Sequence, residues 1–357
     1  VGRGSLESLE RFDGGVVYTA MSLAADGHHA ALIGNSSSHP GEVFVLDLED
    51  QLPPARVTEA NPWLARIRLA PQEVVVHTAR DGLELQGILI RPLDGSTALP
   101  APLVMVVHGG PEGHRRDGWL DRYSSPAQVL AARGYAVFFP NYRGSTGRGV
   151  EFSKLGQADA AGAEFDDLVD AVDHLVEIGV ADNDRVGVTG GSYGGYATAW
   201  LATRYSERFA AGVMFVGISN KISKFGTTDI PMEETLVHAL GYPWERWEHF
   251  FERSPLTHAE RGRTPLLIMG GDADPRVSPT QSLEMYRVLK TFDNVPVRLV
   301  RYPDEGHGNR RAASRYDYQL RLLRWFDRYL MGPGGDPPAM HLDYRSAENG
   351  WEAESED

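Results

Sequence analysis

From about residue 99 onward, short apolar runs alternate with longer stretches whose apolar residues recur at helical spacing. The apolar runs are candidate strands and lie at residues 103–107, 136–140, 185–189, 212–216, 265–269 and 297–302. The helical stretches lie at residues 164–178, 279–290 and 312–330. Continuous apolar strands that alternate with helices are typical of a mostly parallel sheet with helices on both faces. We therefore predict an α/β fold for residues 99–331.

Residues 1–60 have a different pattern, in which short β-rich runs are separated by turn signals. These runs lie at residues 16–20, 30–33 and 42–47. The pattern predicts an antiparallel meander. A meander of this length is too short to bury its own faces, so we expect it to pack on something else.

Three further segments differ in composition from the meander and from the α/β region. Residues 51–62 contain three prolines and are predicted to be a linker. Residues 61–98 form a hinge with a β-hairpin, whose turn is marked by Asp81-Gly82, and lead into the α/β region. Residues 332–357 are rich in Gly, Pro and acidic side chains, which predicts a flexible tail.

The composition narrows the classes of function. The formal net charge of -14 repels phosphate backbones, which argues against nucleic-acid binding. The absence of cysteine excludes disulfides, a thiol nucleophile and thiolate metal sites. The sequence shows no apolar run of about 18 residues and no signal-peptide core, so we expect a cytoplasmic protein without membrane contacts. The oligomeric state is left open, and a homo-oligomer is compatible with the sequence.

A glycine-rich turn follows the predicted strand at residues 185–189 and leads into a helix. Within it, Gly190, Ser192 and Gly194 form a G-x-S-x-G motif between strand and helix. Side chains two residues before or after the serine would collide with these elements, and both positions are glycine. The turn raises the serine hydroxyl above the sheet and places the Tyr193 N–H where it can stabilise an oxyanion. We predict Ser192 as a nucleophile, against the alternative of an ordinary glycine-rich turn.

A serine hydroxyl is a poor nucleophile until a base takes its proton. In folds with this motif, the acid and then the histidine follow in loops after later strands. Two aspartates, Asp272 and Asp274, follow the strand at residues 265–269. We favour Asp274, because it lies three residues after Gly271 and three before Val277, whereas Asp272 is expected to shape the turn.

The candidate base follows the last predicted strand, at residues 297–302. His307 lies there between two glycines, which allow its loop to approach the serine closely. We predict that His307 takes the Ser192 proton and then protonates the leaving group, while Asp274 fixes the tautomer of the imidazole. Three motifs in this order predict a serine hydrolase.

The loop after residues 103–107 is the candidate for the rest of the oxyanion hole. A glycine-rich loop at this place usually supplies the second N–H. We assign Gly110 to this role, with Gly109 as the alternative, and expect His108 to hold the loop. Residues 144–149 look like a phosphate-binding loop, but their glycine spacing does not match the dinucleotide motif. The sequence predicts no cofactor and no metal site.

Together these motifs resemble the prolyl oligopeptidase family of serine peptidases. The matching segments are HGGPEG, NYRGSTGRG, GGSYGGY, GDADPRV and EGHG. The resemblance covers roughly residues 73–330, and the first two segments look most similar to the acylaminoacyl peptidase branch. It implies an α/β-hydrolase fold for the catalytic domain and a β-propeller cap that filters substrates by size.

The resemblance also implies roles for individual residues. By motif position, the triad and the oxyanion donors are Ser192, Asp274, His307, Gly110 and Tyr193. Arg276, two residues after the acid, matches an arginine that binds a substrate carbonyl in some members. Tyr196 and the aromatic stretch around Trp244 are candidates for the pocket of the residue before the scissile bond, with ordinary packing as the alternative.

One feature departs from the family pattern. A full propeller needs several hundred residues, and only about sixty precede the hinge. The meander is predicted to be one terminal blade or a remnant of the propeller. The chain is then either a piece of a longer protein or a hydrolase that works without the cap.

We predict a serine peptidase that hydrolyses peptide or acyl-amino-acid bonds through an acyl-enzyme on Ser192. Its expected partner is a peptide or a small acyl substrate. The alternative is a carboxylesterase that uses the same triad on esters. A third hypothesis, a non-catalytic binding module, is disfavoured because the triad is intact.

Overall fold

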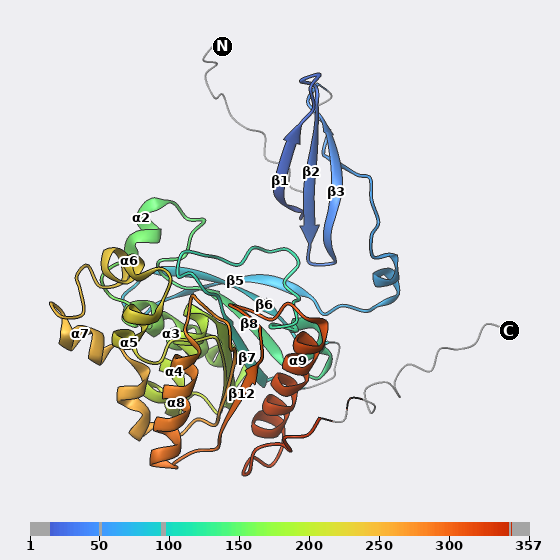
Figure 1. Cartoon of the computed structure of the whole chain (residues 1–357). Helices are drawn as coiled ribbons and strands as arrows, with labels where there is room; N and C mark the ends of the chain where they lie inside the picture. The colour runs from blue at the N-terminus through green and yellow to red at the C-terminus, as the bar shows by residue number, and fades with distance from the viewer. Residues whose placement is uncertain (1–14, 50–51, 94–97, 343, 345–357) are drawn as a thin grey trace.

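The computed structural model describes residues 15–49, 52–93, 98–342 and 344 (Figure 1). These residues form an eight-stranded sheet with its helices and a separate four-stranded sheet near the N-terminus. Most of the predicted tail, residues 345–357, lies outside the described residues, as do residues 1–14 of the predicted meander. Among the described residues, no helix combines the length and the apolar character needed to cross a membrane.

The eight-stranded sheet has the order β12-β11-β10-β9-β7-β8-β6-β5. Its strands are β5 (Gln72–Thr78), β6 (Glu84–Ile90), β7 (Ala101–Val107), β8 (Ala136–Asn141), β9 (Ala181–Gly191), β10 (Ala211–Phe215), β11 (Leu266–Gly271) and β12 (Val297–Tyr302). From β12 to β8 all neighbours are parallel, whereas β6 is antiparallel to both β5 and β8. The prediction of a mostly parallel sheet is confirmed, and the hairpin forms its antiparallel edge.

Helices cover both faces of this sheet (Figure 1). On one face α1 (Ala127–Ala132) and α9 (Ala312–Phe326) pack on alternate residues of β7, such as Val104. The next residue along β7, Met105, faces the opposite core, which includes side chains of α3 (Ala163–Glu177) and α4 (Tyr193–Arg204). The remaining helices are α2 (Val150–Ser153), α5 (Lys221–Thr227), α6 (Pro231–Glu233), α7 (Trp247–Glu252) and α8 (Pro279–Phe292). Single helical turns lie at Pro62–Arg66, Lys154–Gly156, Ser206–Arg208, Glu234–His238, Pro255–Arg261 and Asp327–Met331.

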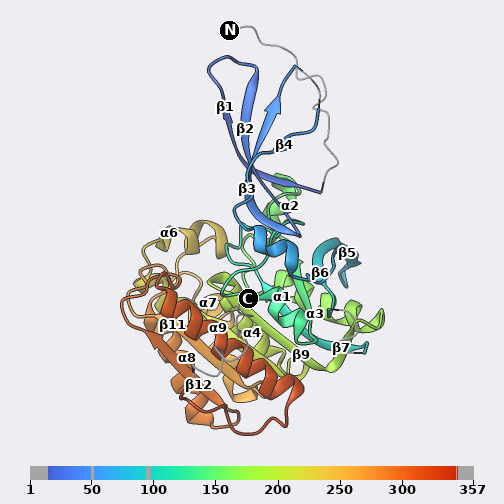
Figure 2. The ribbon, with the colours of Figure 1, turned by 90° about the vertical axis from the view of Figure 1, so that its right-hand side faces the viewer.

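The N-terminal sheet consists of four antiparallel strands and stands apart from the α/β part (Figure 2). Its strands are β1 (Val17–Leu23), β2 (His29–Ser36), β3 (His39–Asp47) and β4 (Ala55–Arg56). The first three follow the predicted meander. The sheet contacts the α/β part where the Trp119 N–H donates to Asn35 Oδ1 at 2.8 Å.

The fourth strand lies within the segment predicted to be a linker. The buried carboxylate of Glu42, on β3, accepts hydrogen bonds from the Thr58 hydroxyl at 2.5 Å and from the Ala60 N–H at 2.8 Å. It also pairs with Arg56 at 3.1 Å. These bonds hold residues 55–60 along the edge of β3, so this part of the segment extends the sheet instead of linking two units.

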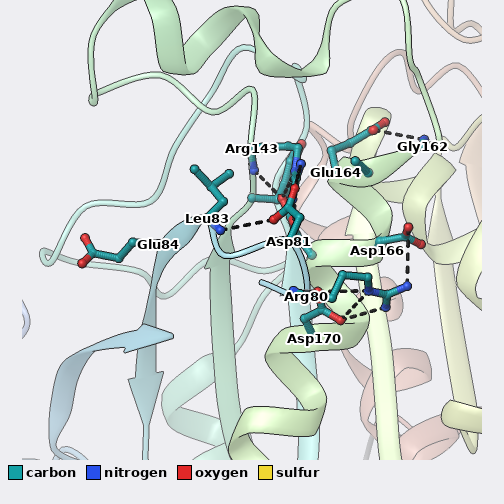
Figure 3. A network of polar contacts seen from close by, with 12 residues as sticks. Arg80, Asp81, Leu83, Glu84, Arg143, Gly162, Glu164, Asp166 and Asp170 are labelled. Carbon is teal, nitrogen blue, oxygen red and sulfur yellow. Dashed lines mark hydrogen bonds and ion pairs between the residues drawn. The ribbon is translucent and has the colours of Figure 1, made fainter. Parts of the chain in front are cut away.

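A polar network fixes the antiparallel hairpin to the rest of the α/β part (Figure 3). Arg80, in the hairpin turn, donates from Nε to Asp170 of α3 at 2.9 Å. Asp81 pairs at 2.7 Å with Arg143, which follows β8. Arg143 also pairs at 2.6 Å with Asp167 of α3, and both side chains are largely buried. Because one arginine joins the hairpin, β8 and α3, the glycine-rich loop that begins at residue 144 starts from a fixed position.

Candidate active site

Ser192 lies between the end of β9 and the start of α4, on the turn that the G-x-S-x-G motif predicts. Its backbone has φ 60° and ψ -121°, in a region that side chains other than glycine rarely adopt. A Cβ at Gly190 would lie 2.5 Å from the Gly194 carbonyl oxygen. A Cβ at Gly194 would lie 2.2 Å from the Val107 carbonyl oxygen. Both glycines are therefore required by close backbone approach, as the sequence pattern predicts.

Asp274 and His307 are brought together from loops after β11 and β12. His307 Nδ1 lies 2.7 Å from Asp274 Oδ2. The other carboxylate oxygen of Asp274 accepts the backbone N–H groups of Arg276 and Val277 at 2.9 and 3.1 Å. The Asp274 side chain is only 1% exposed. These bonds fix the carboxylate and leave one oxygen for the imidazole, an arrangement that orients a histidine for acid–base chemistry.

The competing aspartate, Asp272, lies elsewhere. Its carboxylate pairs with Arg301 of β12 at 2.7 Å, and its backbone N–H donates to the Tyr302 carbonyl oxygen at 3.0 Å. Asp272 thus ties the loop after β11 to the neighbouring strand. The structure places Asp274, and not Asp272, against the histidine.

Ser192 and His307 line the same cavity, which has a volume of about 590 Å³. Within the described residues, Ser192 Oγ forms no hydrogen bond with His307. Such catalytic hydrogen bonds are often long without substrate and tighten when it binds. A second cavity, of about 50 Å³, shares only Ser192 with the first and is also lined by Gly110 and Tyr193.

The loop after β7 runs beside Ser192. A Cβ at Gly109 would lie 3.3 Å from Ser192 Cβ and 3.7 Å from the Tyr193 nitrogen. His108 is buried with its ring stacked on Tyr142, and its Nε2 lies 2.9 Å from the Ser145 hydroxyl. Burial lowers the pKa of His108 to about 4, which keeps the ring neutral. His108 therefore joins this loop to the loop at residues 144–149.

Tyr193 is held by a buried carboxyl group. Its hydroxyl donates to Glu164 Oε1 at 2.9 Å, and the same oxygen accepts the Ala161 N–H at 2.5 Å. The other oxygen of Glu164 accepts the Gly162 N–H at 3.1 Å (Figure 3). Burial raises the pKa of Glu164 to about 7. The first turn of α4, which carries the predicted oxyanion donor, is thus anchored to the start of α3.

The three residues predicted to bind substrate have different positions. Arg276 lines the small cavity beside Ser192, and its Nε pairs with Asp229 at 2.6 Å. Tyr196 is fully buried in the core, with its hydroxyl donating to the Arg253 carbonyl oxygen at 2.5 Å. Trp244 is 68% exposed. Tyr196 and Trp244 line neither of the two cavities that contain Ser192.

Sequence reasoning missed a buried charged cluster behind the small cavity. Lys221 and Lys224 of α5 both form ion pairs with Glu234, at 2.8 Å for Lys224. His238 Nδ1 lies 3.3 Å from the same carboxylate, and all four side chains are at most 3% exposed. The lysines are three residues apart and the Glu234–His238 pair four apart, so the spacing was available. The sequence does not show that the lysine pair and the Glu234–His238 pair face each other.

Three arginines that line the large cavity were also missed. They are Arg115, Arg122 and Arg315. One signal was present, since Arg115 and Arg116 stand together shortly after the glycine-rich loop of an otherwise acidic chain. Within the described ranges, no three His, Asp or Glu side chains gather closely enough to hold a metal ion.

The eight-stranded sheet, the strained serine turn and the Asp274–His307 pair define a chain of the α/β-hydrolase class. Residues 121–332 match the model of the prolyl oligopeptidase family, and these residues are more than half of the chain. The chain belongs to the prolyl oligopeptidase family. The resemblance found in its motifs is confirmed.

Similar proteins include several peptidases. The chain is 40% identical over 272 residues to dipeptidyl aminopeptidase BIII of Pseudoxanthomonas mexicana, which covers 72% of this chain and 38% of that protein. It is 32% identical over 285 residues to the acylamino-acid-releasing enzyme of Sus scrofa, and the match covers 76% of this chain and 38% of that protein. Among solved structures, the Pyrococcus horikoshii acylaminoacyl peptidase has a TM-score of 0.79 at 25% identity, covering 94% of this chain and 52% of that chain. The chain thus spans about two fifths to one half of the length of these relatives.

Proposed function

We propose that this protein is a serine peptidase that forms an acyl-enzyme on Ser192. The observation that carries the proposal is the 2.7 Å contact between His307 Nδ1 and the buried Asp274, in the cavity that also contains Ser192. An imidazole bound in this way presents Nε2 as the acceptor for a serine proton. Membership of a peptidase family supports an amide as the substrate.

In the proposed reaction, His307 accepts the proton of Ser192 as its Oγ attacks the scissile carbonyl carbon. The carbonyl oxygen becomes an oxyanion, which the N–H groups of Tyr193 and Gly110 stabilise. His307 then gives its proton to the leaving nitrogen, and the carbon–nitrogen bond breaks. Water, deprotonated by the same histidine, attacks the acyl-enzyme and releases the acid, and His307 returns its proton to Ser192 Oγ as the ester bond breaks. Asp274 remains ionised and stabilises the imidazolium.

The test compares an acyl p-nitroanilide with the p-nitrophenyl ester of the same acyl group. An amine leaving group needs protonation by His307 more than a phenolate does. We expect the chain to turn over both compounds and the Ser192→Ala variant to turn over neither while remaining folded. Strong ester turnover with negligible anilide turnover would instead make the protein an esterase.

We propose further that the sheet β1–β4, which lies within the predicted meander, is a terminal propeller blade. The sheet β1–β4 supports this, because a four-stranded antiparallel sheet is the repeating unit of a propeller. Met21 and Leu23 of β1 are 70% and 58% exposed, which leaves apolar surface for a neighbouring blade. Deleting residues 1–60 should leave the α/β fold intact, as measured by its circular dichroism. Loss of the cooperative unfolding transition would show that the sheet belongs to the catalytic unit.

A further inference from the structure

The two cavities beside Ser192 can be assigned to the two halves of a substrate. His307 must reach the leaving nitrogen, so the cavity that His307 lines takes the leaving group. The small cavity is lined by the proposed oxyanion donors Gly110 and Tyr193, and His307 is not among its lining residues. It therefore lies on the acyl side. This assignment rests on the proposed function.

The leaving-group cavity is strongly basic. Three arginines line it, and no Asp or Glu of the described residues does so. Within the described part of the chain, Arg115, Arg122 and Arg315 form no ion pair with a carboxylate. The chain as a whole carries a net charge of -14, so this concentration of unpaired positive charge is opposite in sign to the chain's net charge. A cleft lined by one sign of charge raises the local concentration of the opposite charge.

Arg115 is the best positioned of the three. Asn141 clamps its backbone from both sides, because Asn141 Oδ1 accepts the Arg115 N–H at 2.7 Å and Asn141 Nδ2 donates to the Arg115 carbonyl oxygen at 2.9 Å. Its guanidinium lies 5.8 Å from the centre of the Phe139 ring. The buried Nε of Arg115 has no hydrogen-bond partner among the described residues. Burial, followed by the nearby charge of Arg122, lowers the pKa of Arg115 to about 10.

Arg315 is also held in place. Its Nε donates to the Asn309 carbonyl oxygen at 2.8 Å, two residues after His307, and its guanidinium lies 5.3 Å from the centre of the Tyr123 ring. The terminal nitrogens are therefore left for a ligand. Arg122 comes from the same connection as Arg115, between β7 and α1. Guanidinium groups that are held without a counterion match the fork geometry of a carboxylate.

We propose that the cavity beside His307 binds a carboxylate carried by the leaving group, so that the enzyme favours substrates cleaved next to a free C-terminus or an acidic residue. The carboxylate would pair with Arg115 first, with Arg122 and Arg315 closing around it. This pairing would hold the leaving nitrogen beside His307. It does not alter the acyl transfer itself, in which the bond from the carbonyl carbon to nitrogen is exchanged for a bond to Ser192 Oγ.

The test compares three peptides that share one acyl group, acetyl-alanyl or alanyl-alanyl, whichever gives the faster p-nitroanilide. The leaving groups are alanine, alaninamide and aspartic acid α-amide. We expect kcat/KM for alanine to exceed that for alaninamide about tenfold or more, since a hydrogen bond to a charged group contributes at this level. The aspartyl amide separates the two sources of the carboxylate: turnover like that of alanine supports a side-chain carboxylate, and turnover like that of alaninamide supports the C-terminal one.

The variants Arg115→Met and Arg122→Met should each lower the ratio of alanine to alaninamide, about tenfold for Arg115. Arg116→Met is the matched control, because Arg116 is the next residue and does not line this cavity. Its ratio should stay within about twofold of the wild type. If the protein cleaves the p-nitroanilide and turns over all three peptides equally, the carboxylate inference is overturned and the proposed function stands. If it cleaves neither the p-nitroanilide nor any of the three peptides, the proposed peptidase function is overturned.

Discussion

Positive charge lies on both sides of Ser192, but the two sides balance it differently. On the acyl side, Lys221 and Lys224 are buried and both form ion pairs with one carboxylate, that of Glu234. On the leaving-group side, Arg115 faces a cavity of about 590 Å³ in which no described carboxylate balances it. The first arrangement already contains a carboxylate, whereas an anionic ligand would supply one to the second. A buried charge therefore indicates a binding site only when its counterion is absent.

The catalytic groups stand between the two sides, so losing them should affect all substrates equally. We expect Asp274→Asn to lower kcat/KM about 10⁴-fold. The asparagine oxygen can still accept the N–H groups of residues 276 and 277, but its NH₂ group would face His307 Nδ1. Nδ1 must then accept, so Nε2 carries the proton and cannot take one from Ser192.

This loss is measured with p-nitroanilides that differ in their acyl groups. Circular dichroism and thermal unfolding serve as controls for the fold. A loss of less than about tenfold, or a loss that depends strongly on the acyl group, would contradict the role of Asp274.

Because the two sides of Ser192 differ in their counterions, we predict that removing a charged group changes stability in opposite directions on the two sides. Glu234→Gln removes the carboxylate between two buried lysines, and we expect it to lower the free energy of unfolding by about 3 to 5 kcal/mol. Arg115→Met removes a buried charge that has no counterion, so we expect no loss of stability and a small gain. Urea unfolding at pH 7 measures both. If both variants lost stability equally, the two sides would not differ as described.

The stability difference also has a pH dependence. Burial alone would raise the pKa of Glu234, but Lys221 and His238 outweigh it and hold the pKa well below its usual value. A depressed folded-state pKa contributes stability above the unfolded-state value and loses it as the pH falls. The gap between wild type and Glu234→Gln should therefore be widest at neutral pH and narrow in acid. A gap that widens in acid would contradict this sign.

The small volume of the acyl-side cavity predicts a size preference. A cavity of about 150 Å³ is known to hold a benzene ring, so one of about 50 Å³ holds a small side chain but not an aromatic ring. We expect alanine before the scissile bond to exceed phenylalanine at least tenfold in kcat/KM. A series of p-nitroanilides measures this preference. A higher kcat/KM for the phenylalanine p-nitroanilide than for the alanine compound would contradict the size preference and would show that a side chain lining the cavity, such as Lys224 or His238, moves when substrate binds.

The smallest expected effect is that of salt, which should weaken substrate preference on the leaving-group side but not on the acyl side. Arg122 and Arg315 are exposed, so ions can reach the leaving-group side. Raising NaCl from about 0.05 to 0.5 M should reduce the preference for alanine over alaninamide about two- to fivefold. The size preference on the acyl side should not change, because it depends on the volume of the cavity and not on an ion pair with the substrate. An unchanged preference for alanine would argue against charge recognition.

The sheet and the triad could be predicted because each depends on local pattern and chain order. The strands at 103–107 and 265–269 are apolar throughout, and Gly190 and Gly194 are part of a local motif, although Gly194 is required by the approach of Val107 in the neighbouring strand. His307 follows the last strand between glycines, as the order of the fold demands.

The two charged groups beside Ser192 could not be predicted, since they depend on packing between distant segments. Arg115 and Arg122 come from one loop, and Arg315 comes from a helix about two hundred residues further along the chain. The surroundings of Trp244, a candidate for the substrate pocket, also depend on packing: it stacks on Tyr242 with ring centres 4.7 Å apart and is exposed to solvent. The hydrophobic pattern of a sequence indicates on which face of a helix or strand a residue lies, but not which distant side chain it contacts.

The central claim is that Ser192 is the residue that becomes acylated. Its most direct test is the mass of the full chain after reaction with a fluorophosphonate. We predict one adduct per chain, located on the peptide that contains Ser192, slowed by a good p-nitroanilide substrate and absent from Ser192→Ala. A folded wild-type chain that stays unlabelled, or an adduct on another residue, would contradict the account.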